Sequence, residues 1–439
     1  MVWVYQGKQI HRVCVVGAGQ TGQSVIRFLA QYHVAISVFD GNGLTDESIT
    51  AWGQRIHLYA HWSSIDWVQY DLIVVSPGIP INQPPYNLLK QYWSRVIGDI
   101  EIFALMADAP IIAVTGSNGK STTVNALSEC LTAAGYTVGL GGNIGVPALN
   151  LLSLKSVDYY VLELSSFQID LLKTARFTIG CLLNIAPDHL DRYPNFQAYQ
   201  QSKCQLLSHS DWRIVGDSCP VNPQAVDQWI GGKDYFIEKG FLWRDYVQPA
   251  VCDLTQLKLV GAHNWQNIAA IVAIMDYLKI HFADYQQMLY TFQGLAHRCE
   301  HVLTHNGVDI VNDSKATNVS ATKAALVGFL KQSKTVVLLL GGIAKQKDFD
   351  DLLDLLNQNV RHVCLYGQDR AKISHYLKGY TAQTQHLTLN EAFEYALSQA
   401  HHGDVVLLSP GCSSFDAYDN FAQRGQHFKQ LARNKQKSC

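Results

Sequence analysis

The segment Thr115–Thr123, TGSNGKSTT, combines residue types and a spacing that can bind phosphate. It follows the apolar run IIAV and precedes a helical pattern from Ser121, so it predicts a strand, a glycine loop and a helix N-terminus. Unpaired N–H groups and the helix dipole favour an anion there. Lys120 would reach the terminal phosphates, and the Ser121 hydroxyl would be a ligand of Mg²⁺. The spacing G-x-x-G-K-S is shorter than the general phosphate loop, and the alternative is a Gly-Asn turn before an amphipathic helix.

A second glycine loop, GAGQTG, lies near the N-terminus between the strand pattern RVCVV and a helical pattern. The next strand pattern, AISVF, ends at Asp40. Glycines for a tight turn, a helix N-terminus for a diphosphate and an acid for a ribose hydroxyl are typical of a dinucleotide-type site. The same segment could bind another nucleotide diphosphate or could serve only to pack a helix on a sheet.

Two apolar runs after the phosphate loop, DYYVLELSSFQ and TIGCLLNIAPDHLDRYP, carry polar groups at their ends. In a parallel sheet those ends meet beside the phosphate loop. Glu163, Asp188 and His189 are therefore expected near Ser121 around Mg²⁺, although Mg²⁺ prefers oxygen and a histidine ligand would be unusual. Each residue alone could equally be a carboxylate facing water or a histidine capping a turn.

Further polar groups follow at helix starts and strand ends. Asn264 and Asn267 lie three apart at the start of the helical pattern His263–Leu278, where they could cap the helix, read an adenine edge or hold a phosphate oxygen. Arg298 stands in GLAHRCE, at the start of the last segment. Polar clusters in that segment again follow strand patterns, as in NDSKATN and PGCSSFD.

The elements that must position these residues alternate between strand and helix along the whole chain, which predicts an α/β protein with mainly parallel sheets flanked by helices. At 439 residues, with about 150 residues per domain, three domains are expected. We place a Rossmann-like domain at residues 1–96, a central phosphate-loop ATPase domain at 97–296 and a Rossmann-like C-terminal domain at 297–439.

Charge and cysteine usage exclude several classes of protein. A net charge of −2 argues against a nucleic-acid partner or an anionic membrane held by bulk electrostatics. Ten cysteines are scattered without a C-x-x-C pair, as is typical of reduced thiols in a cytosolic protein. No signal-peptide pattern and no apolar stretch of ~18 residues is present. We therefore expect a soluble, cytoplasmic protein without membrane insertion.

Seven motifs stand in one order along the chain: TGSNGKS, ELSSFQ, NIAPDHLDRY, GAHNWQN, GLAHRCE, NDSKATN and LSPGCSSFD. Together they resemble the Mur ligase family over nearly the whole chain. The first segment with SPGIP and GDIE, and the third with NDSKATN, are most similar to the members that add D-glutamate.

The resemblance implies an ATP-driven amide synthesis in peptidoglycan precursor formation, with D-glutamate, UDP-N-acetylmuramoyl-L-alanine and ATP as the small-molecule substrates. The acceptor carboxylate would attack the γ-phosphate of ATP to give an acyl phosphate, which the amine of D-glutamate would then attack. Mg²⁺, expected as two ions, would be the cofactor, and we expect a monomer.

The resemblance also implies residue roles. Catalysis would involve Lys120, Lys203, His189 and Lys315. Metal binding would involve Ser121, Glu163, His189 and Lys203, the last if carbamylated, because CO₂ turns an ammonium into an anionic oxygen ligand. From the sequence alone, Lys203 is predicted to be an exposed helical lysine.

The expected ATP contacts are Gly116, Ser117, Asn118, Gly119, Lys120, Ser121, Thr122, Asn264, Asn267, Arg298 and Asp313. Those for the UDP-sugar are Gln20, Thr21, Asp40, Ser76, Pro77, Gly78, Asn143 and His189. Those for D-glutamate are Thr317, Lys345, Ser414, Phe415 and Phe421, with Lys347 as an alternative to Lys345.

Alternative functions remain open at this point. Another amino-acid-adding Mur ligase or a folylpolyglutamate-type ligase would share the phosphate loop. A nicotinamide-dependent oxidoreductase would account for GAGQTG and Asp40 but not for the second loop. A nucleotide-binding switch without catalysis would use ATP only to order its domains.

Overall fold

The structure is a computed structural model that describes residues 2–41, 56–189, 192–244, 250–259, 263–344 and 349–437. It divides into two compact units, residues 1–236 with 270–285 and residues 237–269 with 286–439. The boundary passes through helices α8 (His263–Tyr277) and α9 (Phe282–Thr291). The three domain ranges expected from the sequence stay a prediction.

The first unit begins with a small antiparallel pair and a parallel five-stranded sheet in the order β5-β4-β3-β6-β7. Its elements are β1 (Trp3–Tyr5), β2 (Lys8–Ile10), β3 (Arg12–Val16), α1 (Gln20–Leu29), β4 (Ala35–Phe39), β5 (Ile56–Tyr59), η2 (Trp62–Ser64), η3 (Trp67–Gln69), β6 (Leu72–Val75), η4 (Tyr86–Arg95) and β7 (Val96–Ile97). The chain goes from β3 to β4 on one side and returns to β6 on the other. The order therefore reverses at β3, and the carboxyl ends of β3 and β6 are where ligands of such sheets bind.

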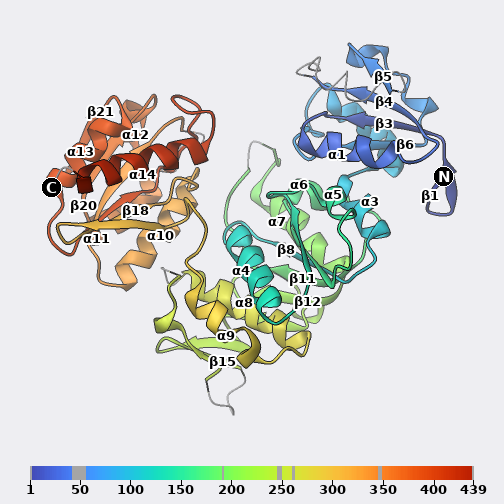
Figure 1. Ribbon diagram of the computed structural model, residues 1–439. Helices are drawn as coiled ribbons and strands as arrows, with labels where there is room; N and C mark the ends of the chain where they lie inside the picture. Colours follow the sequence, from blue (N-terminus) through green and yellow to red (C-terminus); the bar gives the residue numbers. More distant parts are fainter. Residues whose placement is uncertain are drawn as a thin grey trace. The chain divides into compact units, whose positions relative to one another are not determined.

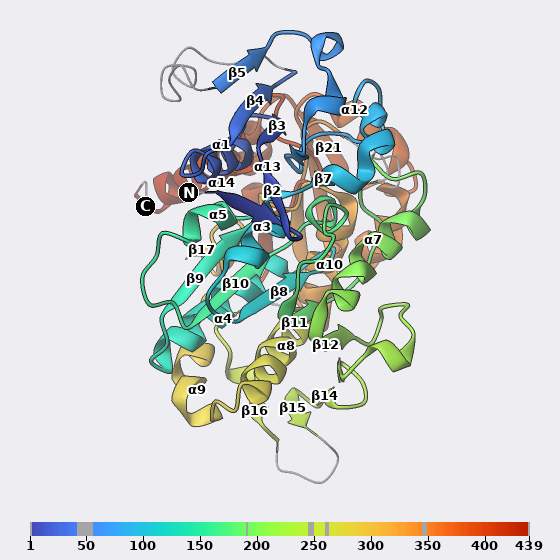
Figure 2. The ribbon, with the colours of Figure 1, turned by 90° about the vertical axis from the view of Figure 1, so that its right-hand side faces the viewer.

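The first unit continues with a second sheet, whose strands β9, β10, β8, β11 and β12 lie side by side in Figure 2. The elements are α3 (Asp99–Met106), β8 (Ile111–Thr115), α4 (Lys120–Ala133), β9 (Val138–Gly142), α5 (Ala148–Leu151), β10 (Tyr159–Glu163), α6 (Ser166–Ile169), β11 (Phe177–Leu182), α7 (Phe196–Ser208), β12 (Ser210–Gly216), η5 (Pro223–Ala225), β13 (Gln228–Ile230) and β14 (Tyr235–Glu238). β8 pairs in parallel with both β10 and β11. The phosphate loop after β8 therefore lies between the ends of those two strands.

A buried glutamate joins parts of this first unit that lie far apart in sequence. Glu101 on α3 accepts hydrogen bonds from the backbone N–H groups of Lys173, Thr174 and Ala175 and from the Tyr5 hydroxyl. These bonds stabilise the ionised form, so the pKa of Glu101 is lowered although burial alone would raise it. The apolar core continues across the same region, because residues of α1, α3, α5 and β10 belong to one cluster.

The second unit contains a short antiparallel pair and a six-stranded sheet in the order β17-β18-β22-β19-β20-β21, drawn in orange and red in Figure 1. Its elements are β15 (Phe241–Arg244), β16 (Cys252–Asp253), η6 (Leu254–Gln256), β17 (Glu300–His305), β18 (Val308–Asn312), α10 (Val319–Lys331), β19 (Val336–Gly341), η7 (Phe349–Leu352), α11 (Leu353–Asn359), β20 (Val360–Tyr366), α12 (Arg370–Tyr376), β21 (Gln383–His386), α13 (Leu389–Gln399), β22 (Val405–Leu408) and α14 (Phe421–Lys437). Helices α10, α11 and α12 pack on one face of the larger sheet, and α13 and α14 pack on the other.

The α/β class with mainly parallel sheets flanked by helices is thus confirmed. Both faces of the C-terminal sheet are covered, and this explains why its strands β19 and β22 are continuous apolar runs without alternation. Among the helices that the structure describes, none combines the length and the apolar character needed to cross a lipid bilayer.

Candidate functional site

The phosphate loop has the predicted conformation, with its helix α4 beginning at Lys120, one residue before the expected start. Gly119 lies in the left-handed region at φ 83°, where a side chain would be strained. The Lys120 Nζ donates to the carbonyl oxygens of Gly116, at 2.6 Å, and Ser117, at 2.9 Å. The lysine thus lies over its own loop, close to where the N–H groups of the first helical turn can bind an anion.

A second segment holds this loop in place, and the sequence did not indicate it. The Asn184 side chain after β11 accepts from the backbone N–H of Asn118 at 2.9 Å and donates to the Asn118 carbonyl at 3.1 Å. The Ser117 hydroxyl donates to the Ala186 carbonyl at 2.9 Å and lies 3.0 Å from the Tyr199 hydroxyl. The position of Asn184 directly after an apolar strand was the available signal.

Ser121 and Glu163 meet as the sequence predicted. Their side chains come from the first turn of α4 and the end of β10, and the Ser121 hydroxyl donates to Glu163 Oε2 at 2.5 Å. The Asn143 side-chain amide donates to the other oxygen, Oε1, at 2.8 Å. Both Ser121 and Glu163 are buried. A hydroxyl and a carboxylate are hard oxygen ligands, so this donor set fits Mg²⁺.

Lys203 is buried, with 2% of its surface exposed, and the prediction of an exposed lysine is wrong. On α7 it shares a buried face with Tyr199 and Leu206, at the spacing of one helical turn. Its Nζ donates to the Gly116 carbonyl at 3.0 Å and to the Thr115 hydroxyl at 3.4 Å. Burial, and then the charge of Lys120, lower the pKa of Lys203 well below its ordinary value. The helical period of α7 was the signal that could have identified it.

His189 lies at the edge of this cluster, in a left-handed backbone conformation at φ 54°. Its ring lies 5.0 Å from that of Phe167 and 6.1 Å from that of Tyr199, measured between centroids. Its Nε2 lies 3.7 Å from Asp188 Oδ2. Within the described ranges, no three His, Cys, Asp or Glu side chains form a group that could hold a metal ion. The role of His189 at a second metal therefore stays a prediction.

Side chains that follow strands of the same sheet form hydrogen bonds with the backbone of the first glycine loop. Asp40 Oδ2 accepts from the Ala18 backbone N–H at 2.6 Å, and the Ser76 hydroxyl donates to the Gly17 carbonyl at 2.9 Å. A β-carbon at Gly22 would lie 1.8 Å from the Gly17 carbonyl oxygen, so only glycine lets α1 approach the turn this closely. Gln20 and Thr21 form the first turn of α1.

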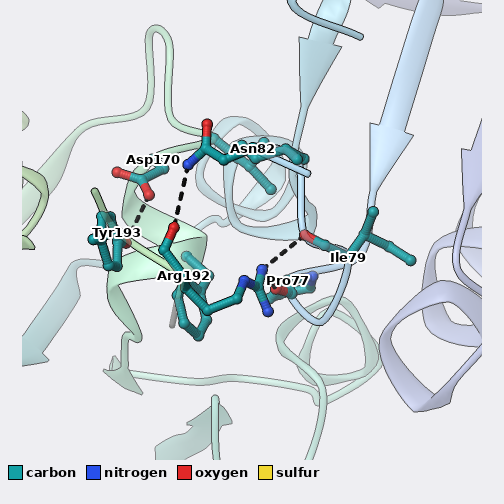
Figure 3. A pocket seen from close by; sticks show the side chains of 9 residues that line it. Pro77, Ile79, Asn82, Asp170, Arg192 and Tyr193 are labelled. Atoms are coloured by element: carbon teal, nitrogen blue, oxygen red, sulfur yellow. Dashed lines mark hydrogen bonds between the residues drawn. The ribbon is translucent and has the colours of Figure 1, made fainter. Parts of the chain in front are cut away.

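Arg192 connects the two sheets of the first unit (Figure 3). It lies between β11 and α7, beside the second sheet, and contacts the loop after β6 of the first sheet. Its guanidinium donates to the carbonyl oxygens of Pro77, Gly78 and Ile79 at 3.3, 3.1 and 2.8 Å and lies 4.2 Å above the Phe167 ring. Beside it is a small pocket. The residues that line it are Pro77, Ile79, Ile81, Asn82, Phe167, Asp170, Leu171, Arg192 and Tyr193. No pattern in the sequence indicated Arg192 as a functional residue.

Several predicted residues lie in the second unit. Asn267 Nδ2 donates to Asn264 Oδ1 at 2.8 Å, so the two amides share one face of α8. The Asp313 carboxylate accepts from the Cys299 backbone N–H at 3.2 Å and the Ser409 hydroxyl at 2.8 Å. Burial nevertheless raises the pKa of Asp313 to about 7. Because Asp313 binds the backbone N–H of Cys299, it lies close to Arg298, the preceding residue in the chain.

The residues expected to bind D-glutamate follow the carboxyl ends of strands in the C-terminal sheet. The Lys315 Nζ lies 3.9 Å above the Phe421 ring, and Ser414 is buried whereas Phe415 is exposed. The residues Lys345 and Lys347 lie outside the described ranges, so the structure does not test that alternative.

A buried arginine that sequence reasoning missed supports this C-terminal region. Arg424 on α14 donates to the hydroxyl and carbonyl oxygens of Ser314 at 3.0 and 2.9 Å and to the Cys412 carbonyl at 3.1 Å. It therefore connects the start of α14 to the loop that contains Ser314 and Thr317 and to the loop that contains Cys412 and Ser414.

Three family models match successive parts of the chain. They are described as the Mur ligase MurD-like N-terminal domain, over residues 11–98, the Mur ligase middle domain, over residues 114–215, and the Mur ligase glutamate ligase domain, over residues 297–412. The chain is 41% identical over 438 residues, 99% of each chain, to the UDP-N-acetylmuramoylalanine–D-glutamate ligase of Francisella tularensis subsp. novicida (strain U112).

Solved structures share this fold at lower identity. The ligase MurC from Thermotoga maritima has a TM-score of 0.59 and 17% identity, over 98% of this chain and 100% of that chain. MurF ligase from the same organism, in complex with ADP, has a TM-score of 0.60 and 16% identity, over 98% of this chain and 96% of that chain.

Proposed function

Because the chain belongs to the Mur ligase family, we propose that it joins D-glutamate to UDP-N-acetylmuramoyl-L-alanine at the expense of ATP. The observation that carries this proposal is the 41% identity over 99% of the chain to a ligase of that name. The reaction is a step of peptidoglycan precursor synthesis. We place it in the cytoplasm, with a monomeric enzyme and only small molecules as partners.

The chemistry requires two steps, because a carboxylate does not accept an amine until one of its oxygens becomes part of a leaving group. The terminal carboxylate of the UDP-sugar attacks the γ-phosphorus of ATP, and the bond to ADP breaks. The product is an acyl phosphate. The amine of D-glutamate then attacks its carbonyl carbon, loses a proton and expels inorganic phosphate. Charge stabilisation at the transferred phosphoryl group is the main demand on the protein.

The phosphate loop meets that demand with residues whose contacts are described above. Gly116 to Thr122 present N–H groups and hydroxyls to the ATP phosphates, and Lys120 moves from its loop carbonyls to the phosphoryl oxygens. Ser121 and Glu163 would hold Mg²⁺. When bound, Mg²⁺ supplies positive charge that neutralises the phosphoryl oxygens.

We assign Lys203 as a carbamylated ligand for magnesium. The support is its burial and its lowered pKa, because a neutral amine is the form that adds CO₂. Carbamylation would turn this buried amine into an anion beside the Lys120 ammonium, and the two opposite charges would attract each other. His189 would bind a second ion and the UDP-sugar.

The remaining assignments rest on the resemblance of the motifs to the Mur ligase family. ATP is bound further by Asn264, Asn267, Arg298 and Asp313, and Lys315 acts near the reacting phosphate. The UDP-sugar is bound by Gln20, Thr21, Asp40, Ser76, Pro77, Gly78 and Asn143. D-glutamate is bound by Thr317, Lys345, Ser414, Phe415 and Phe421.

The test is phosphate release from ATP in the presence of the UDP-sugar and a panel of amino acids and folates. We expect release with D-glutamate and little with L-alanine, diamino acids or folates. Release with a diamino acid or a folate instead would assign the chain to another amino-acid-adding ligase. No amino-acid-dependent release at all, with nicotinamide absorbance in the purified protein, would favour the oxidoreductase.

A further inference from the structure

The hydroxyl of Tyr86 occupies the place where a side chain at position 41 would lie. Tyr86 is the first residue of η4, and Gly41 follows Asp40 after β4. A β-carbon at Gly41 would lie 2.5 Å from the Tyr86 hydroxyl oxygen but 3.9 Å from Cζ, the ring carbon that bears it. The first distance is too short for any real contact, whereas the second is ordinary. A side chain at position 41 would therefore displace the hydroxyl, whereas the ring carbon leaves room for it.

The ring of Tyr86 is held by a cluster of aromatic side chains. Its centroid lies 5.0 Å from that of Trp62, with the planes at 81°. Trp62 in turn packs against Phe39 at 5.3 Å and Trp67 at 4.6 Å. Edge-to-face contacts of this kind are favourable, so the hydroxyl has a defined position.

This position lies on the ligand side of the first sheet. Asp40 and Gly41 follow the carboxyl end of β4, and the segment that leads to Tyr86 begins with Ser76 at the carboxyl end of β6. Tyr86 therefore approaches the end of β4 from the β6 side of the point where strand order reverses. In a dinucleotide-type unit, the acid at the end of this strand lies beside the ribose of the nucleotide.

The hydroxyl remains available to a ligand. Burial and the nearby charge of Asp40 both raise the pKa of Tyr86, so the group stays protonated and can donate as well as accept a hydrogen bond. Among the residues that the structure describes, none provides a hydrogen-bond partner for it. The side chain is only partly buried, so a ligand can reach the hydroxyl.

We propose that the Tyr86 hydroxyl binds the nucleoside of the UDP-sugar and is a specificity-determining contact of this chain. The inference rests on the proposed function for the identity of the nucleotide. The proposed site combines a neutral hydroxyl with the Asp40 carboxylate, and these groups can bind a ribose hydroxyl or the polar edge of uracil.

Tyr86→Phe tests this contact, because it removes only the hydroxyl. In the full-length protein we expect UDP to bind about three- to tenfold more weakly by calorimetry. The KM for the UDP-sugar should rise by the same factor, with kcat and Tm unchanged. If the loss of affinity vanishes with 2′-deoxy-UDP as the ligand, the contact is to the 2′-hydroxyl; if the loss persists, the contact is to the rest of the nucleoside.

Tyr92→Phe, which removes another hydroxyl from η4, is the matched control and should leave UDP affinity unchanged.

A second substitution, Gly41→Ser, made alone and together with Tyr86→Phe, distinguishes a role of the hydroxyl in ligand binding from a role in packing. Gly41→Ser alone should weaken UDP binding more than Tyr86→Phe does, because its β-carbon meets the hydroxyl. In the double variant the new serine hydroxyl replaces the lost one, and Cζ at 3.9 Å is no obstacle, so affinity should recover toward the original value.

Unchanged UDP affinity in Tyr86→Phe, or a lowered Tm with unchanged affinity, would overturn the inference and identify Tyr86 as a packing residue. Absence of UDP binding by the unaltered protein would overturn it as well. Since UDP binding is measured without turnover, a Tyr86-dependent affinity in a protein that fails to use D-glutamate would support the nucleoside contact while rejecting the proposed reaction.

Discussion

Two segments of the first unit have the same order of strand, glycine loop and helix, but side chains of opposite charge bind the two loops. In the first, after β3, a loop N–H donates to the Asp40 carboxylate. In the second, after β8, two loop carbonyls accept from the Lys120 ammonium. The first loop, GAGQTG, thus binds an acidic side chain and contains no lysine or arginine, whereas the second contains a cation that can move to a ligand. The same backbone pattern is therefore suited in one case to a nucleoside with a diphosphate and in the other to a phosphoryl group that is transferred.

The contrast extends to the surroundings of the two loops. The second loop is backed by a buried hydroxyl and carboxylate pair, Ser121 with Glu163, and by the buried amine of Lys203. The first loop is backed by the Ser76 hydroxyl and by carbonyls that Arg192 binds. The charged groups that back the second loop, Glu163 and Lys203, are buried, whereas the charged groups near the first loop, Asp40 and Arg192, are only partly buried.

The largest effect is expected from Lys120→Ala. Removal of the cation at the transferred phosphoryl group should lower kcat by about 10²- to 10³-fold or more, as measured by phosphate release. Lys155→Ala, which removes an exposed lysine, is the control and should leave kcat unchanged. Near-normal turnover of Lys120→Ala would remove the distinction between the two loops.

Lys203→Ala should come next, with a loss of about 10²-fold or more, because the buried amine is replaced by a methyl group that cannot become a metal ligand. Small carboxylates such as formate or acetate should restore part of the activity by entering the vacated space. Chloride at equal ionic strength serves as the control. A failure of every carboxylate to restore activity would count against carbamylation.

Arg192→Lys should have an intermediate effect, confined to the UDP-sugar side of the unit, because Arg192 contacts the loop after β6. A lysine cannot reach three successive carbonyls and stack on Phe167 as the planar guanidinium does. We expect about tenfold weaker binding of the UDP-sugar and unchanged binding of ATP, by calorimetry with each ligand alone. Arg176→Lys, in an exposed ion pair with Asp211, is the matched control. Equal losses for both ligands would show that Arg192 supports the whole unit and not the loop it contacts.

The smallest effect is expected from Asp40→Asn. The amide can still accept from the Ala18 N–H but without a charge, so the affinity for UDP should fall only about two- to fivefold. Asp66→Asn, where the carboxylate accepts from the Val68 N–H at 3.2 Å, gives the background effect of the same change on η3. A loss as large as that of Lys120→Ala would mean that charge matters equally in the two loops.

The sequence by itself determined the α/β class, both glycine loops and the pairing of Ser121 with Glu163. These depend on local patterns, namely strand runs, glycines and helix starts, and on the rule that the ends of parallel strands share one edge of a sheet. The order of the seven motifs also indicated the family, which the near-full-length relatives confirm.

Only the tertiary structure decided which residues from distant segments support those loops. Asn184 and Tyr199 form hydrogen bonds with the phosphate loop, and Arg192 forms them with the loop after β6. The Tyr86 hydroxyl lies close to Gly41, and the buried Lys203 donates to the Gly116 carbonyl. Each is a polar residue whose partner lies in another element. The local pattern can indicate a strand end, as for Asn184, or a buried helix face, as for Lys203, but it does not identify the partner. Burial depends on how helices pack on sheets, and for this reason an apparently exposed lysine was found in the interior of the site.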